Sequence, residues 1–144
     1  MRASHGFTLI EFLVVIALIA IGTAAVSFSL RDSAQTVLEK DAERLAALFE
    51  SARARSRSSG MPVKWYPQAV SNSSSSGFVF EGLPSNTLPQ QWLSPQIQVA
   101  PNSLVVLGPD PIIGPQSVVL QMSDLQLWVS TDGLKPFAVR RTAP

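Results

Sequence analysis

The hydrophobic residues of the chain follow two different patterns, and the change between them falls near Gly60. Before that point, residues 12–30 contain no charged side chain, and Arg31-Asp32 closes the apolar run. At a rise of about 1.5 Å per residue, this run would form a helix about 28 Å long, close to the hydrocarbon thickness of a bilayer. The pattern therefore predicts a membrane-spanning helix over residues 7–30.

Beyond Arg31 the apolar residues recur at steps of three and four, which is typical of an amphipathic helix packed along one face. The predicted buried stripe contains Ala34, Val37, Leu38, Ala42, Leu45, Leu48, Phe49 and Ala52. Gly60 fits the residue that follows a helix end, and Pro62 prevents the helix from resuming. We therefore predict an amphipathic helix over residues 31–59 that continues the apolar one.

The polar face of this amphipathic helix carries acidic residues early and basic residues late. Among them are Asp32, Glu39, Asp41, Glu43, Glu50, Arg53, Arg55 and Arg57. Their order suits the helix dipole, which favours cations near the C-terminus. We interpret them as a polar face, and the three arginines as a solvated helix end rather than a nucleic-acid-binding patch.

From Met61 onward the hydrophobic period changes to two residues, which is typical of β-strands. Seven short strands are predicted, over residues 63–66, 78–80, 97–99, 104–107, 118–122, 125–130 and 137–140. Asp132-Gly133 is a hairpin signal between the last two. The serine-rich residues 71–76 are too polar for a core and are expected in a surface loop. We predict an α+β fold, in which the long N-terminal helix packs on a small antiparallel β-sandwich head over residues 60–144.

Composition argues against most kinds of catalytic and metal site. The 144-residue chain contains no cysteine, and its one histidine is His5. The acidic residues of the head are scattered along the sequence rather than paired, and no glycine-rich phosphate-binding loop is present. We therefore expect no enzymatic activity, no metal ion and no cofactor. Eleven Lys+Arg stand against ten Asp+Glu, so the charge balance makes nucleic acid an unlikely partner.

One acidic residue, Glu11, lies inside the apolar segment. It follows Gly6-Phe7-Thr8-Leu9-Ile10 directly. A carboxylate at a bilayer centre costs about 2.5 to 3.5 kcal/mol on insertion scales, so a functional role is the default interpretation. A secretory signal peptide cleaved near Ala24-Ala25 is one alternative, but such signals have a shorter apolar core without an acid. A plain membrane anchor is another, and it leaves Glu11 unexplained.

The sequence from Gly6 to Glu11, followed by a long apolar helix, resembles the class III leader of type IV pilins and type II secretion pseudopilins. The resemblance implies that a prepilin peptidase cleaves between Gly6 and Phe7 and methylates the new amine of Phe7. Residues 1–6 would then be the leader. The resemblance also implies an assembly role for Glu11, whose carboxylate would meet the Phe7 amine of a neighbouring subunit. It further implies a single-pass protein of the cell inner membrane with its head in the periplasm.

The rest of the chain is similar, more loosely, to the H-type minor pseudopilins of type II secretion (the GspH family). The similar segments are residues 50–63, 77–83 and 107–116 and the closing hairpin at Asp132-Gly133. This resemblance implies a minor subunit at or near the tip of the pseudopilus, with other minor and major pseudopilins as partners. The alternative is a FimT-like minor pilin that binds DNA for uptake, for which Arg140-Arg141 is the candidate basic motif.

Overall fold

The computed structural model describes residues 9–69 and 76–143, with the backbone alone described at residues 24–32, 69 and 76. This part of the chain divides into two compact units, one that ends at Ala34 and one that begins at Gln35. The serine-rich segment that we predicted as a surface loop falls outside the described residues, apart from Ser76. Gly6 and Phe7 also fall outside them.

A single long helix, α1 (Leu9–Ser59), occupies the first part of the described chain. It ends where the sequence predicts, because Gly60 has a φ of 68°, a left-handed conformation that glycine adopts without steric cost. A side-chain hydrogen bond from within the helix also stabilises this end. The Ser56 hydroxyl donates to the carbonyl oxygen of Met61 at 2.6 Å, which holds the chain as it leaves α1.

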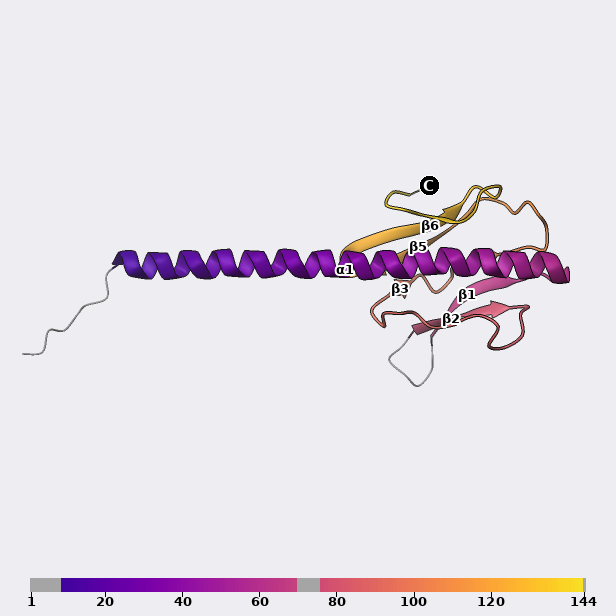
Figure 1. The fold of residues 1–144 in the computed structure, drawn as a ribbon, viewed down its shortest axis with the longest axis horizontal. Helices are drawn as coiled ribbons and strands as arrows, with labels where there is room; N and C mark the ends of the chain where they lie inside the picture. Colours follow the sequence, from indigo (N-terminus) through magenta and orange to yellow (C-terminus); the bar gives the residue numbers. More distant parts are fainter. Residues whose placement is uncertain (1–8, 70–75, 144) are drawn as a thin grey trace, which may run out of the picture. The chain divides into compact units, whose positions relative to one another are not determined.

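Within the described residues, seven strands follow α1 and form two antiparallel sheets, and Figure 1 shows strands beside the second half of α1. They are β1 (Lys64–Ala69), β2 (Ser76–Glu81), β3 (Gln98–Val99), β4 (Val105–Val106), β5 (Gln116–Met122), β6 (Leu125–Thr131) and β7 (Ala138–Arg140). One sheet has the order β2-β1-β4, and the other has the order β3-β5-β6-β7. The predicted α+β fold, with an N-terminal helix and antiparallel sheets, is confirmed.

Strand β1 continues three residues beyond its predicted end at Tyr66 and includes Pro67. Proline lacks an N–H group, which normally excludes it from a central strand. Here β4 pairs only with Lys64 and Trp65, so one side of β1 is an unpaired edge by the time the chain reaches Pro67. The short length of β4 therefore makes this longer strand possible.

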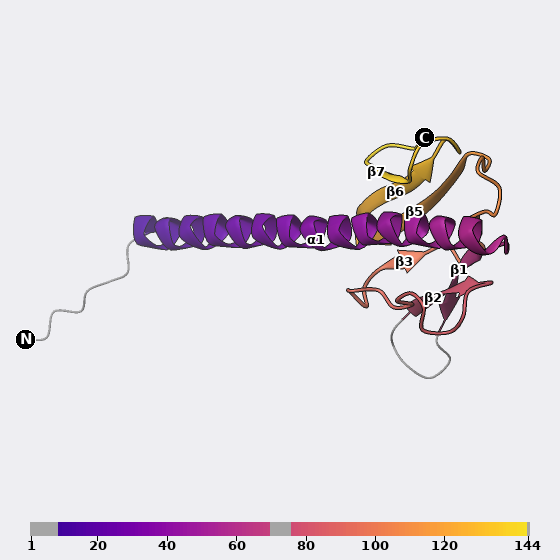
Figure 2. The ribbon, with the colours of Figure 1, turned by 45° about the vertical axis from the view of Figure 1, so that its right-hand side comes forward.

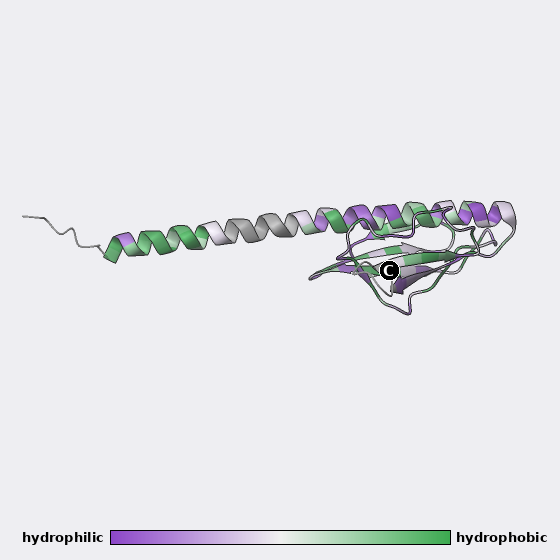
Figure 3. Cartoon of the chain, turned by 90° about the horizontal axis from the view of Figure 1, so that it is seen from below, coloured by the Kyte–Doolittle hydropathy of each residue, from purple (hydrophilic) through white to green (hydrophobic). Residues whose placement is uncertain are grey.

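The core of the second unit lies where the second half of α1 crosses the layer of strands. Figure 3 shows the helix along one face of the strands, and Figure 2 shows β6 and β7 on one side of the helix and β1 and β2 on the other. The buried apolar residues of the helix are Leu38, Ala42, Leu45, Ala46, Leu48, Phe49 and Ala52. Six of these seven belong to the predicted stripe, whereas the predicted Ala34 and Val37 are only partly buried.

Aromatic rings fill the space between α1 and the two sheets. The Phe49 ring lies 5.2 Å from that of Trp65 and 4.8 Å from that of Phe137, with both pairs in edge-to-face geometry. Phe78 and Trp92 extend the cluster on the side of the β2-β1-β4 sheet, with their centroids 4.7 Å apart. Phe49 therefore connects the helix to both sheets.

Two charged residues that we assigned to the polar face of the helix are buried instead. Asp41 is 1% exposed, and its carboxylate accepts hydrogen bonds from the backbone amides of Leu93 at 2.9 Å and Ser94 at 3.1 Å. Arg53 is 4% exposed and donates to Glu50 at 3.1 Å, so the interpretation of Arg53 as solvated is wrong. Asp41 is tolerated inside because a loop of the head provides its polar partners, and Arg53 because Glu50 on α1 and the Pro111 carbonyl, at 3.5 Å, accept from it.

A glutamine side chain joins the two sheets. The amide group of Gln116 in β5 accepts from the backbone N–H of Val106 at 2.7 Å and donates to the Val106 carbonyl at 2.9 Å. These two bonds reproduce the pairing that a neighbouring strand would make with β4. One side chain therefore closes the outer edge of β4.

Both hairpins of the second sheet depend on left-handed backbone positions. The predicted turn at Asp132-Gly133 is confirmed between β6 and β7, where Gly133 has a φ of 94°. The Asp132 carboxylate accepts from the amides of Leu134 at 3.0 Å and Lys135 at 2.8 Å, and these bonds lower its pKa. The β5–β6 turn at Ser123 was not predicted, because a serine with a φ of 54° gives no glycine signal.

Candidate assembly site

Glu11 lies in the first turn of α1, within the part of the helix that the structure describes. Its sequence neighbours Ile10 and Phe12 are 70% and 56% exposed. Gly6 and Phe7, the other two predicted site residues, lie outside the described residues, and so does the amine that would face Glu11. The structure therefore describes the residue that carries the acid of the predicted pair but not the amine that would face it.

Large apolar side chains surround Glu11 on every side of the helix. The exposed ones are Leu9, Ile10, Phe12, Leu13, Val14, Val15, Ile16, Leu18, Ile19 and Ile21. Figure 3 shows the same stretch as a hydrophobic segment of α1. Because successive residues are about 100° apart around the axis, they cover the whole circumference rather than one stripe. A helix that is apolar all round packs against other apolar helices or lipid.

Judged on the described residues alone, no helix has the length of apolar sequence that crossing a membrane requires.

A carboxylate within this apolar surface is suited to bind a positive charge. In water-poor surroundings an opposite charge offsets much of the cost of burying an ion, whereas an unpaired ion remains expensive. In a bundle of such helices, Glu11 would favour the one register that brings a cation to it. An assembly role for Glu11 in such a bundle stays a prediction.

The N-terminal sequence agrees with this geometry. Residues 1–27 match the family model of the prokaryotic N-terminal methylation motif. The match supports a type IV pilin-like protein, and it spans Gly6, Phe7 and Glu11. Such a motif is typical of membrane-anchored pilins, which a prepilin peptidase processes and which assemble with other pilin subunits. Neither the curated proteins nor the solved structures gave a match to the chain.

Among the described residues, an ion pair connects the C-terminal segment to α1. Arg141 donates to Glu39 at 2.7 Å, and its side chain is otherwise 73% exposed. The pKa of Glu39 is lowered first by a hydrogen bond from the Gln35 side chain and then by Arg141. Half of the predicted basic motif Arg140-Arg141 is thus engaged within the chain.

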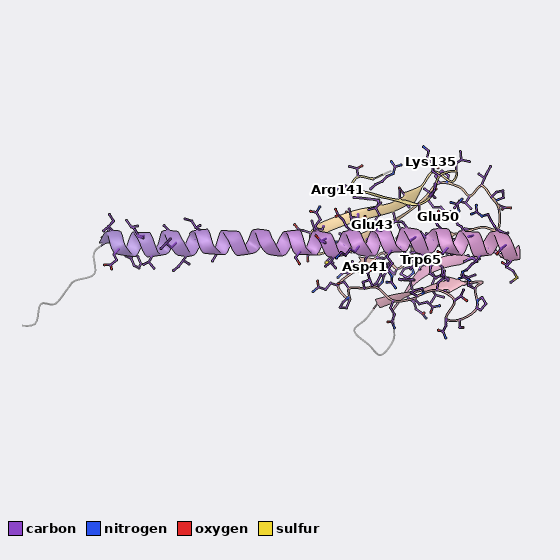
Figure 4. The ribbon with its side chains drawn as sticks, in the orientation of Figure 1. Asp41, Glu43, Glu50, Trp65, Lys135 and Arg141 are labelled. Atoms are coloured by element: carbon purple, nitrogen blue, oxygen red, sulfur yellow. The ribbon has the colours of Figure 1, made fainter. Side chains whose placement is uncertain are left out.

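A second contact that the sequence did not reveal joins α1 to the β6–β7 hairpin. The backbone N–H of Phe137 donates to the Glu50 carboxylate at 3.0 Å, and the same oxygen accepts from Arg53. Figure 4 shows Glu43 and Glu50 on α1 beside the C-terminal hairpin that carries Lys135. The pattern placed Glu50 on the polar face but could not indicate which backbone amide it meets.

Between α1 and β7 lies a groove of about 430 Å³. It is lined by Glu43, Ala46, Ala47, Glu50, Phe137, Ala138 and Val139. We call it the α1–β7 groove. Its helix wall carries two carboxylates and two alanines, whereas its other wall is the end of the hairpin.

No group of three or more potential metal ligands occurs among the described residues. The Asp132 carboxylate, which stands beside Gly133, is used in the hairpin by two backbone amides. This role explains an acidic residue at that turn.

Proposed function

We propose that the chain is a minor pseudopilin of a type II secretion pseudopilus, which helps export folded proteins across the outer membrane. The observation that carries this proposal is the match of residues 1–27 to the N-terminal methylation motif, with Glu11 inside an apolar helix surface. An N-terminal helix followed by antiparallel sheets is consistent with it. The H-type assignment rests on the looser resemblance of the head segments.

In the proposed mechanism, prepilin peptidase removes residues 1–6 and methylates the amine of Phe7. The apolar half of α1 then holds the subunit in the inner membrane by a single pass, with the head in the periplasm. On extraction into the fibre, the Glu11 carboxylate pairs with the Phe7 amine of the adjoining subunit, which fixes the stagger between helices. The protein works by assembly, without catalysis or a cofactor.

The head is proposed to act as a β-sandwich that contacts other minor pseudopilins at or near the tip. Few copies are expected, because residues 60–144 carry four basic and four acidic side chains, which offer little electrostatic means of self-complementarity. Major pseudopilins below it would contact the apolar half of α1.

A DNA-uptake role, as in FimT-like minor pilins, would require an available basic surface. Phosphate binding depends on several Lys and Arg side chains acting together. Arg141 is paired with Glu39 at 2.7 Å, and the head has no excess of positive charge. Both observations favour secretion over DNA binding.

The test is a deletion strain complemented with two forms of the protein, the unaltered chain and the double variant Arg140→Ala and Arg141→Ala. Deletion should reduce export of folded substrates, and both forms should restore it, because the arginines are not needed for assembly. Normal export together with loss of DNA uptake would establish the alternative. Overproduction of this subunit alone should give no long fibres by electron microscopy, and long fibres would make it a major subunit.

A further inference from the structure

The head has four sheet edges, and two of them are covered by the chain itself. Beside β2, the Phe78 amide donates to the Gln90 carbonyl at 2.9 Å, and Gly77 forms a bridge with Gln91. Beside β4, the Gln116 side chain occupies both polar groups of Val106. A third edge belongs to β3, which is only two residues long. An open strand edge can pair with a strand of another chain, and the contacts beside β2 and β4 prevent such pairing at those two edges.

The fourth edge belongs to β7, and within the described residues β7 pairs with β6 only. The direction of its outward groups is inferred from Phe137, which directly precedes β7 and donates its N–H to Glu50 on α1. Backbone groups along a strand alternate in direction, so Val139, two residues later, presents its N–H to the same side. Val139 also lines the α1–β7 groove, so this open edge faces the groove.

The α1 wall of the groove, opposite β7, determines the size and charge of a segment that could bind there. Ala46 and Ala47 present only methyl groups to the groove, whose volume is about 430 Å³. Glu50 is already engaged by Arg53 and by the Phe137 amide. Glu43 is exposed and forms no ion pair among the described residues, so it provides the net negative charge of the groove.

We propose that the α1–β7 groove binds an extended segment of another polypeptide, which pairs as an added strand with β7 and places a basic side chain against Glu43. The open backbone edge selects an extended strand rather than a helix, because only a strand presents unpaired N–H and C=O groups. Glu43 selects the charge of that strand. The proposal depends only on the unit from Gln35 onward and stands whatever the role of the earlier part of α1.

The test uses full-length protein in detergent micelles and a fluorescein-labelled peptide of alternating threonine and valine with one central lysine. Binding is measured by fluorescence anisotropy. Glu43→Lys should weaken binding about five- to tenfold, because an attractive exposed pair becomes a repulsive one. A peptide with glutamate in place of lysine should show the reverse preference and bind Glu43→Lys better than the unaltered protein. Methylation of the peptide's backbone nitrogens should abolish binding of both peptides.

The matched control is Glu81→Lys, which makes the same charge change at an exposed position on β2. It should leave the affinity unchanged. Ala47→Trp fills the groove without altering charge and should also prevent binding, so the test does not depend on one variant folding correctly. Equal affinity for Glu43→Lys and the unaltered protein, equal affinity of the N-methylated peptide, or no binding of the lysine peptide would each overturn the proposal.

Discussion

Variants at the proposed cleavage site between Gly6 and Phe7 test processing separately from assembly. Cleavage requires a small residue before the scissile bond, so Gly6→Val should leave the precursor uncut, whereas Ser4→Val in the same leader should be processed normally. Intact-mass measurement of the purified protein should show a mature chain that begins at methylated Phe7. A chain beginning near Ala24 or Val26 would instead indicate a secretory signal peptide.

Glu11 tests the assembly step. Glu11→Leu removes an acid that costs about 2.5 to 3.5 kcal/mol at a bilayer centre, so its level in the membrane should be equal to or higher than that of the unaltered protein. Recovery in the crosslinked fibre should fall, because the amine of the adjoining subunit loses its partner. Blotting of membranes and of crosslinked fibre separates the two quantities. Ile10→Leu is the matched control, and equal fibre recovery for both variants would exclude a contact at Glu11.

Asp41 and Arg53 show what single residues in a sequence do not reveal. Helical periodicity assigns each residue an angle around α1, and it assigned both residues to a polar face. It contains no information about the backbone amides of Leu93 and Ser94, which lie more than 50 residues away in sequence and satisfy Asp41. The burial of an ionised side chain depends on such distant partners, so it became visible only in the folded head.

At the level of elements, the period of two and the turn residues located every strand, because these signals are local. The sequence could not provide strand order, which depends on long-range pairing, or the extension of β1 through Pro67. It also missed the β5–β6 turn, since Ser123 adopts a positive φ without the glycine that usually marks one. The N-terminal motif is equally local, so its family model could be matched from sequence alone, whereas the roles of Gly6, Phe7 and Glu11 stay predictions.

Gly133 in the β6–β7 hairpin gives a test of packing between elements. An added Cβ would overlap the carbonyl oxygen of Ile113, and the φ of 94° is unfavourable for any other residue. Gly133→Ala should therefore lower the free energy of unfolding by about 1 to 3 kcal/mol. Gly114→Ala, where no atom lies within 4 Å of the new Cβ, should cost much less. The measurement is the denaturant midpoint of each variant, and equal midpoints would contradict the close approach of the two loops.

At the scale of the whole molecule, the unit from Gln35 onward should lose stability in acid. Glu39 and Asp132 have folded-state pKa values below their ordinary values of 4.5 and 3.8. Their contribution is therefore complete above those ordinary values and is lost as the pH falls through the lower folded values. The unfolding midpoint should decrease with acidification in that range.

A matched pair of arginine variants measures how much Glu39 contributes to the decrease of the unfolding midpoint in acid. Arg141→Leu removes one cause of the lowered pKa of Glu39 and should make the decrease shallower. Arg140→Leu removes the same charge without touching Glu39 and should retain the slope of the unaltered protein. Identical slopes for the two variants would show that the Arg141–Glu39 pair does not contribute in solution.

The Gln116 bridge has a consequence for how the head tolerates changes in loop length. Within each sheet, a continuous ladder of backbone bonds fixes the register, and a slip by one residue would turn every side chain to the wrong face. Between the sheets, the described backbone pairing is replaced by a single flexible amide group. A change of loop length within one sheet therefore leaves the register of the other sheet intact, because no continuous ladder crosses this junction. The two sheets are registered separately while they share one helix.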